Sequence, residues 1–181
     1  ISIIHLSDLR PDHLSLIMFI FLLTYLYKIR DNLSITRKDI LIIFFLFTLW
    51  ANLHGGFTYG FALILIFIAG SLINENLPFI YGEKKEITLL QTKKFITLFL
   101  IALLSSFINP YGYKIYNIFF EHLLNLEKYQ NYIMEWKEIE LGKINISFLL
   151  ISSSFIIISY LIKFIKHRKV DMVLVFMMVF F

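Results

Sequence analysis

The residues best suited to chemistry lie in a few short polar stretches of an otherwise apolar chain. The first stretch contains Asp8, Arg10 and Asp12 around a proline. The guanidinium of Arg10 is planar and always charged, so it can hold a phosphate or a carboxylate. The same residues also fit an ordinary helix start, in which Asp12 lies near the positive end of the helix. Both interpretations stay open on the sequence alone.

The second stretch contains Asn52 and His54, followed directly by Gly55 and Gly56. Two helices must reverse here with almost no loop, and we expect the glycine pair to supply positive φ angles. An asparagine and a histidine are costly near hydrocarbon unless they are paired. They therefore either make structural hydrogen bonds or contact a substrate. Gly60, one turn later, predicts a close approach between helices.

The third stretch begins at Asn109, in an Asn-Pro-Tyr-Gly turn, and ends at Glu135 and Trp136. Between them, polar residues recur at helical spacing opposite apolar ones, which predicts an amphipathic interfacial helix over residues 111–128. Such a helix either covers a bundle or shapes the entrance for a lipid-borne substrate. Glu135 can act as a base, a metal ligand or a hydrogen-bond acceptor, whereas Trp136 is typical of the headgroup level.

The elements that must position these stretches are membrane helices. Of the 181 residues, 59% are hydrophobic and 17% are charged, and the mean hydropathy is +0.76. Soluble domains carry about 25% charged residues, so the composition disfavours a globular cytosolic enzyme. The chain has no cysteine, which rules out disulfides, thiolate zinc sites and a cysteine nucleophile.

Hydropathy predicts an all-α, polytopic transmembrane bundle of about six spans. The predicted spans are residues 13–29, 40–53, 57–73, 95–108, 144–162 and 170–181. They are continuous apolar runs without in/out alternation, which favours helices over barrel strands. The last run is too short to cross, because a span needs about 20 apolar residues. We therefore expect residues 1–181 to be a single integral membrane domain and a fragment of a larger protein.

The basic residues predict the orientation of this bundle. Twelve of the 17 lysines and arginines fall in alternate loops, at residues 28–38, 84–94 and 163–169, which leaves five elsewhere. We expect these basic loops to be cytoplasmic, solvated connectors. The polar stretches then face the periplasm or exterior of a bacterial inner membrane. Nucleic-acid binding has no support, because the basic residues are split among short loops.

Two of the predicted helices, 40–53 and 95–108, are unusually short. Their length is about 21 Å at 1.5 Å per residue, against an apolar core about 30 Å thick. Either they end below the outer surface, so that Asn52, His54 and Asn109 line a recessed cavity, or they borrow a turn from their flanks.

The order of these motifs resembles bacterial polytopic glycosyltransferases of the GT-C type. The relatives in question are protein O-mannosyltransferases and the aminoarabinose transferases that modify lipid A. The motifs are Arg10-Pro11, Trp-Ala-Asn-Leu-His-Gly-Gly-Phe at 50–57, Asn-Pro-Tyr-Gly at 109–112, and Glu135-Trp136. The resemblance covers about residues 8–140, and the string at 50–57 is its most specific part.

The resemblance implies an enzyme that takes a sugar from a polyprenyl-phosphate carrier at the outer membrane face and passes it to a lipid, glycan or protein. The candidate substrate-binding residues are Arg10, Asn52, His54, Asn109 and Trp136. Arg10 and His54 are assigned to phosphate contacts. The catalytic carboxylate stays unassigned, with Asp8 and Glu135 as candidates, because we expect the first helix of such enzymes and its outer loop to lie outside this chain. A divalent metal is implied by the resemblance alone.

Two other functional classes of membrane protein stay open as alternatives to a glycosyltransferase. A transporter or flippase of a lipid or sugar places polar groups near the bilayer midplane. Here the polar groups gather on one side, which favours interfacial chemistry over alternating access. A non-catalytic membrane scaffold is the second alternative. The donor sugar, the acceptor and the oligomeric state are not predicted.

Overall fold

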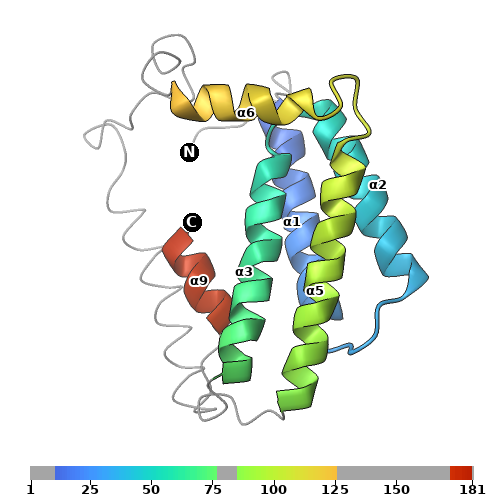
Figure 1. The fold of residues 1–181 in the computed structure, drawn as a ribbon, viewed down its shortest axis with the longest axis vertical. Helices are drawn as coiled ribbons and strands as arrows, with labels where there is room; N and C mark the ends of the chain where they lie inside the picture. The colour runs from blue at the N-terminus through green and yellow to red at the C-terminus, as the bar shows by residue number, and fades with distance from the viewer. Residues whose placement is uncertain (1–10, 77–84, 126–171, 181) are drawn as a thin grey trace, which may run out of the picture. The chain divides into compact units, whose positions relative to one another are not determined.

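The computed structural model describes residues 11–76, 85–125 and 172–180, and within these ranges every regular element is an α-helix. The helices are α1 (Pro11–Ile29), α2 (Arg37–Leu53), α3 (Phe57–Asn76), α5 (Lys85–Ser106), α6 (Lys114–Leu124) and α9 (Met172–Phe180) (Figure 1). The predicted all-α class is confirmed for this part of the chain. The predicted span at 144–162 lies outside the described residues.

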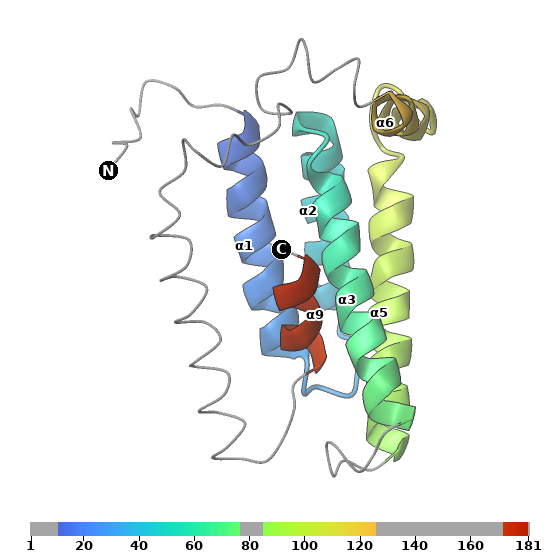
Figure 2. The same cartoon turned by 90° about the vertical axis from the view of Figure 1, so that its left-hand side faces the viewer.

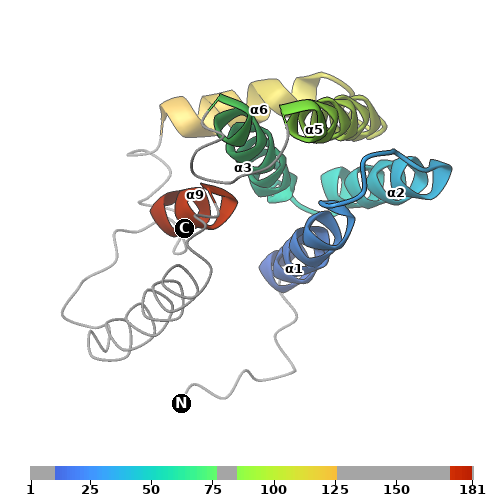
Figure 3. The same ribbon diagram turned by 90° about the horizontal axis from the view of Figure 1, so that it is seen from below.

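Helices α1, α2, α3 and α5 run alternately in opposite directions, so the end of α1 lies near the start of α2, and the end of α2 lies near the start of α3 (Figures 1 and 2). α3 makes the most extensive contacts, with α5 on one side and α9 on the other, and it also touches α1 (Figure 3). These five helices belong to one compact unit, whereas α6 belongs to a second unit. The residues of α6 fall within the range 111–128 predicted for the interfacial helix, and α6 begins after the turn at 109–112.

The core between α2, α3 and α5 is built from aromatic rings. Phe47, Trp50 and Phe95 are fully buried, and the Phe47 and Phe61 rings stack with their centroids 5.1 Å apart. A Cβ atom on Gly60 would lie 2.8 Å from the Phe47 ring and 2.9 Å from the Trp50 ring. The predicted close approach at Gly60 is therefore confirmed.

The helices predicted to be short are longer in the structure. α2 begins at Arg37 because Thr36 and Asp39 form a capping box, in which each side chain binds the other residue's backbone N–H. α5 begins at Lys85, so its lysines lie within the helix rather than in a loop. The 17 residues of α2 and the 22 of α5 correspond to about 25 and 33 Å. Both helices thus gain extra turns at their first residues. α5 is now long enough for an apolar core about 30 Å thick, whereas α2 is still about 5 Å shorter, so the recess at the ends of these helices stays a prediction.

Two described helices are long and apolar enough to cross a membrane. They are α1, over Pro11–Ile29, and residues Leu89–Ser106 of α5. α3 contributes a shorter apolar stretch, Phe57–Ile73. These helices support membrane association, and the six-span arrangement remains a prediction.

Candidate functional site

In the turn between α2 and α3, the glycines have a different role from the predicted one. The only described glycine with a positive φ is Gly112, at 54°, so the expectation for Gly55 and Gly56 is wrong. The chain turns instead through His54, whose backbone is extended at φ −161° and ψ 148°. Gly56 is needed for space, because a Cβ atom there would lie 2.6 Å from Ser15 Oγ. The tight turn thus brings the start of α1 against His54.

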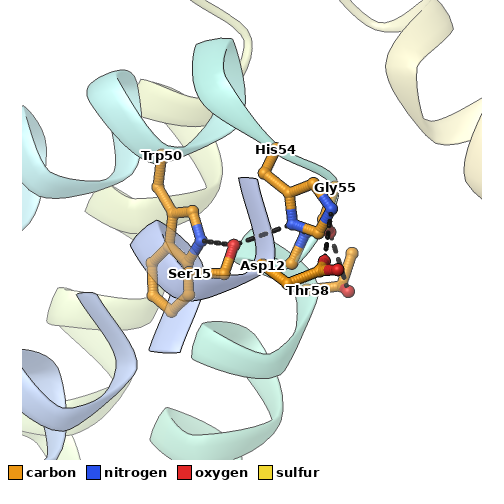
Figure 4. Close-up of polar contacts among 7 residues, drawn as sticks. Asp12, Ser15, Trp50, His54, Gly55 and Thr58 are labelled. Atoms are coloured by element: carbon orange, nitrogen blue, oxygen red, sulfur yellow. Dashed lines mark hydrogen bonds and ion pairs between the residues drawn. The ribbon is translucent and has the colours of Figure 1, made fainter. Parts of the chain in front are cut away.

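Four side chains form a continuous polar chain at this end of the bundle (Figure 4). The Trp50 indole N–H donates to Ser15 Oγ at 2.9 Å. Ser15 Oγ lies 2.8 Å from His54 Nδ1, and His54 Nε2 lies 3.0 Å from Asp12 Oδ1. The chain therefore connects α2, the start of α1 and the α2–α3 turn. We call these four residues the outer relay, because the orientation predicted from the basic residues places them on the outer side.

Hydrogen-bond donors around the ring indicate its tautomer. The Gly56 backbone N–H donates to His54 Nδ1 at 3.1 Å, so that nitrogen acts as an acceptor. Ser15 Oγ accepts the Trp50 N–H and lies 2.8 Å from the same nitrogen, so a ring that accepts at Nδ1 takes the Ser15 hydroxyl as a second donor. The proton of a neutral ring then lies on Nε2 and is donated to Asp12. Both ring nitrogens are engaged, so His54 orients the Asp12 carboxylate.

Exposure increases steadily along the outer relay. Trp50 is fully buried and Ser15 is 8% exposed, whereas the side chains of His54 and Asp12 are 33% and 52% exposed. The relay therefore ends on a carboxylate that a substrate can reach. A carboxylate held by a histidine can accept a proton from a hydroxyl group.

A groove of about 300 Å³ opens beside this carboxylate. Its lining residues are Asp12, Ser15, Leu16, Phe19, Trp50, His54 and Tyr59. The polar atoms come from the relay at one end, and apolar and aromatic side chains form the remaining walls. Such a combination of apolar walls and a few convergent polar groups is typical of a ligand site.

Asn52 and Asn109 have structural partners. The Asn52 amide donates to the carbonyls of Thr48 and Ile108, both at 2.7 Å, which ties the end of α2 to the segment after α5. The Asn109 amide donates to Ser106 O at 2.7 Å, and its side-chain oxygen accepts the Tyr111 N–H at 2.7 Å. The two asparagines therefore fix helix ends, whereas His54 belongs to the outer relay.

The structure adds Ser15 and Asp12 to the candidate site. Their spacing of three residues places them on the same face of a helix, a signal that was present in the sequence without a visible partner. The other candidates, Asp8, Arg10, Glu135 and Trp136, lie outside the described residues.

The opposite end of the bundle contains buried charges, which corrects the expectation that the basic loops are only solvated connectors. Lys94 is 2% exposed. Its ammonium group donates to the carbonyls of Ile29, Arg30 and Asn32 at the end of α1. The ammonium therefore caps α1, where the helix dipole favours a cation.

Asp39 forms a second buried group at that end. Its carboxylate accepts hydrogen bonds from the Tyr25 hydroxyl at 2.5 Å and from the Thr36 backbone and hydroxyl at 2.8 Å. Burial by itself raises the pKa of the Asp39 carboxyl, but these hydrogen bonds, with the attraction of Lys94, hold that pKa below its usual value. A cavity of about 610 Å³ nearby is lined by loop residues 31–34, Thr36 and Leu90.

Within the described ranges, no group of three or more histidine, aspartate and glutamate side chains could hold a metal ion. Family models, curated proteins and solved structures include no match to the chain. The geometry of the outer relay and of its groove is therefore the basis for a functional proposal.

Proposed function

We propose that this chain is part of a multi-pass membrane glycosyltransferase of the GT-C type. It moves a sugar from a polyprenyl-phosphate carrier to an acceptor hydroxyl at the outer face of a bacterial inner membrane. The observation that carries the proposal is the outer relay, because it ends on the half-exposed carboxylate of Asp12 beside an apolar groove.

The distribution of side chains supports a bundle solvated by lipid. Large apolar residues face outward, including Ile17 at 62%, Phe45 at 63% and Leu104 at 67% exposed. Charged Asp39 and Lys94 are instead 6% and 2% exposed. Soluble proteins rarely expose extensive apolar surface, whereas helices in a bilayer turn polar groups inward. The arrangement of about six spans predicted from hydropathy is part of this proposal.

The positions of the helix ends support the proposed orientation. α1 begins, α2 ends and α3 begins beside the outer relay, whereas the basic residues of 28–38 and Lys93 lie toward the other end of these helices. Loops rich in lysine and arginine stay in the cytoplasm. The relay therefore faces the periplasm or exterior, where polyprenyl-linked sugars are used.

In the proposed reaction Asp12 is the base. The acceptor hydroxyl gives its proton to the Asp12 carboxylate while its oxygen forms a bond to the anomeric carbon. The bond from that carbon to the carrier phosphate breaks, and the phosphate oxygen keeps the electron pair. His54 positions Asp12 through Nε2, and the phosphate contact falls to Arg10, whose guanidinium suits that anion.

Sugar transfer in membranes that contain this protein tests the proposal. Asp12→Asn keeps an oxygen for His54 but removes the base, so transfer from a radiolabelled polyprenyl-phosphate sugar should fall by about 10²- to 10⁴-fold. Asp31→Asn is the matched control, because it changes an exposed aspartate at the other end of α1. Unchanged transfer by Asp12→Asn would refute the role of Asp12. Movement of the sugar lipid across the bilayer without transfer would favour the transporter.

A further inference from the structure

We infer that the groove beside Asp12 binds the acceptor, and that this acceptor is a lipid alcohol with a neutral hydroxyl head and a long apolar chain. The inference rests on the proposed function and names its acceptor class. It follows from the shape of the groove, the charge at its end and the hydrogen bonds of its polar atoms.

The groove extends from the polar end of α1 toward its apolar middle. Asp12 lies at one end and Phe19 lies seven residues further along the helix, a distance of about 10 Å at 1.5 Å per residue. Leu16 and Tyr59 line the groove, and they are 57% and 60% exposed. A molecule with its polar head at Asp12 would therefore place its chain against apolar side chains.

The charge of Asp12 selects the head group. An ionised carboxylate repels the phosphate of a polyprenyl carrier at contact distance, whereas it accepts a hydrogen bond from a hydroxyl group. The groove thus suits a neutral alcohol better than the donor phosphate.

The hydrogen bonds of the relay disfavour a peptide or a glycan in the groove. Ser15, Trp50 and His54 already bind one another, which leaves Asp12 as the charged group that a ligand can reach. A peptide or sugar would bury amides or hydroxyl groups without partners, at a cost of about 1–3 kcal/mol each. An apolar chain has no such groups, so only its head needs a partner.

Photocrosslinking tests this site without measuring catalysis. The protein is reconstituted in nanodiscs with hexadecanol that carries a diazirine, irradiated and digested. We expect labelling of α1 and α3 that unlabelled hexadecanol competes away. Leu16→Trp should fill the groove and reduce this labelling about tenfold. Ile17→Trp is the matched control, because Ile17 is 62% exposed on the same helix but does not line the groove.

Competition separates the possible occupants. Polyprenyl phosphate that competes more strongly than hexadecanol would assign the groove to the donor and overturn the inference. Equal labelling of the Leu16→Trp and Ile17→Trp proteins would overturn it too, because the label would then report general contact with lipid. Normal labelling by the alcohol together with absence of sugar transfer would refute the proposed function while leaving a lipid-alcohol site. The two failures are therefore distinguishable.

Discussion

Replacing Lys94 with methionine tests whether the buried ammonium holds together the end of the bundle opposite the outer relay. Lys94 comes from α5, and its ammonium binds three carbonyls at the end of α1. Methionine has a similar apolar stem but no donor. The substitution therefore removes the cap on α1 with little change in the packing of the stem.

Two opposing effects set the size of the loss. Each hydrogen bond from a charged group contributes about 1.5–3 kcal/mol, and three carbonyls lose their donor. Burying the ammonium costs several kcal/mol, which the substitution recovers, and water can reach some of the carbonyls. We therefore expect Lys94→Met to lower the free energy of unfolding by about 2–4 kcal/mol.

The neighbouring lysine provides the control. Lys93 is exposed, so Lys93→Met should change the free energy of unfolding by no more than about 0.5 kcal/mol. Both variants are purified in a mild detergent and unfolded by titration with sodium dodecyl sulfate. In a Trp136→Phe background the fluorescence of fully buried Trp50 reports unfolding. Equal losses for the two lysines, or no loss for Lys94→Met, would refute the capping role.

Two further predictions concern stability. Gly60→Ala should lower the free energy of unfolding by about 1–2 kcal/mol in the same titration, because overpacking against the Phe47 and Trp50 rings exceeds the gain in helix propensity. Gly55→Ala, with nothing within 4 Å of the added carbon, should be close to neutral, and a reversed order would contradict this packing. The lowered pKa of Asp39 stabilises the fold above the usual carboxyl pKa, and this stabilisation is lost as pH falls through the lowered value. Unfolding measured from about pH 6 to pH 3 should therefore be less pH-dependent in Asp39→Asn, and an unchanged profile would contradict it.

The helices were largely predictable from the sequence, but two of their beginnings were not. Hydropathy located α1, α2, α3 and α5, because apolar runs of this length have few alternatives in a membrane. It placed the start of α5 at 95, ten residues too late, because lysines lower the hydropathy without ending a helix. It also missed the start of α2 at Arg37, where a capping box rather than an apolar residue sets the boundary.

The candidate site was only partly predictable. The cost of placing an unpaired histidine near hydrocarbon indicated that His54 needed partners, and the structure supplies Asp12 and Ser15. Those partners lie 42 and 39 residues away along the chain, so their identity depends on how α1 packs against the α2–α3 turn. The role of the glycines depended on the same packing. Gly56 makes room for Ser15 and does not adopt a positive φ.

The polar groups at the two ends of the bundle differ in their exposure and therefore in their role. At the end opposite the outer relay, the Lys94 and Asp39 charges are buried, and their hydrogen bonds go to helix ends and neighbouring side chains. Such contacts stabilise the fold and leave little capacity for a ligand. At the outer end, the relay begins at buried Trp50 but finishes at half-exposed Asp12. The buried members of the outer relay hold the exposed carboxylate in place. This is the arrangement that the proposed proton transfer to Asp12 requires.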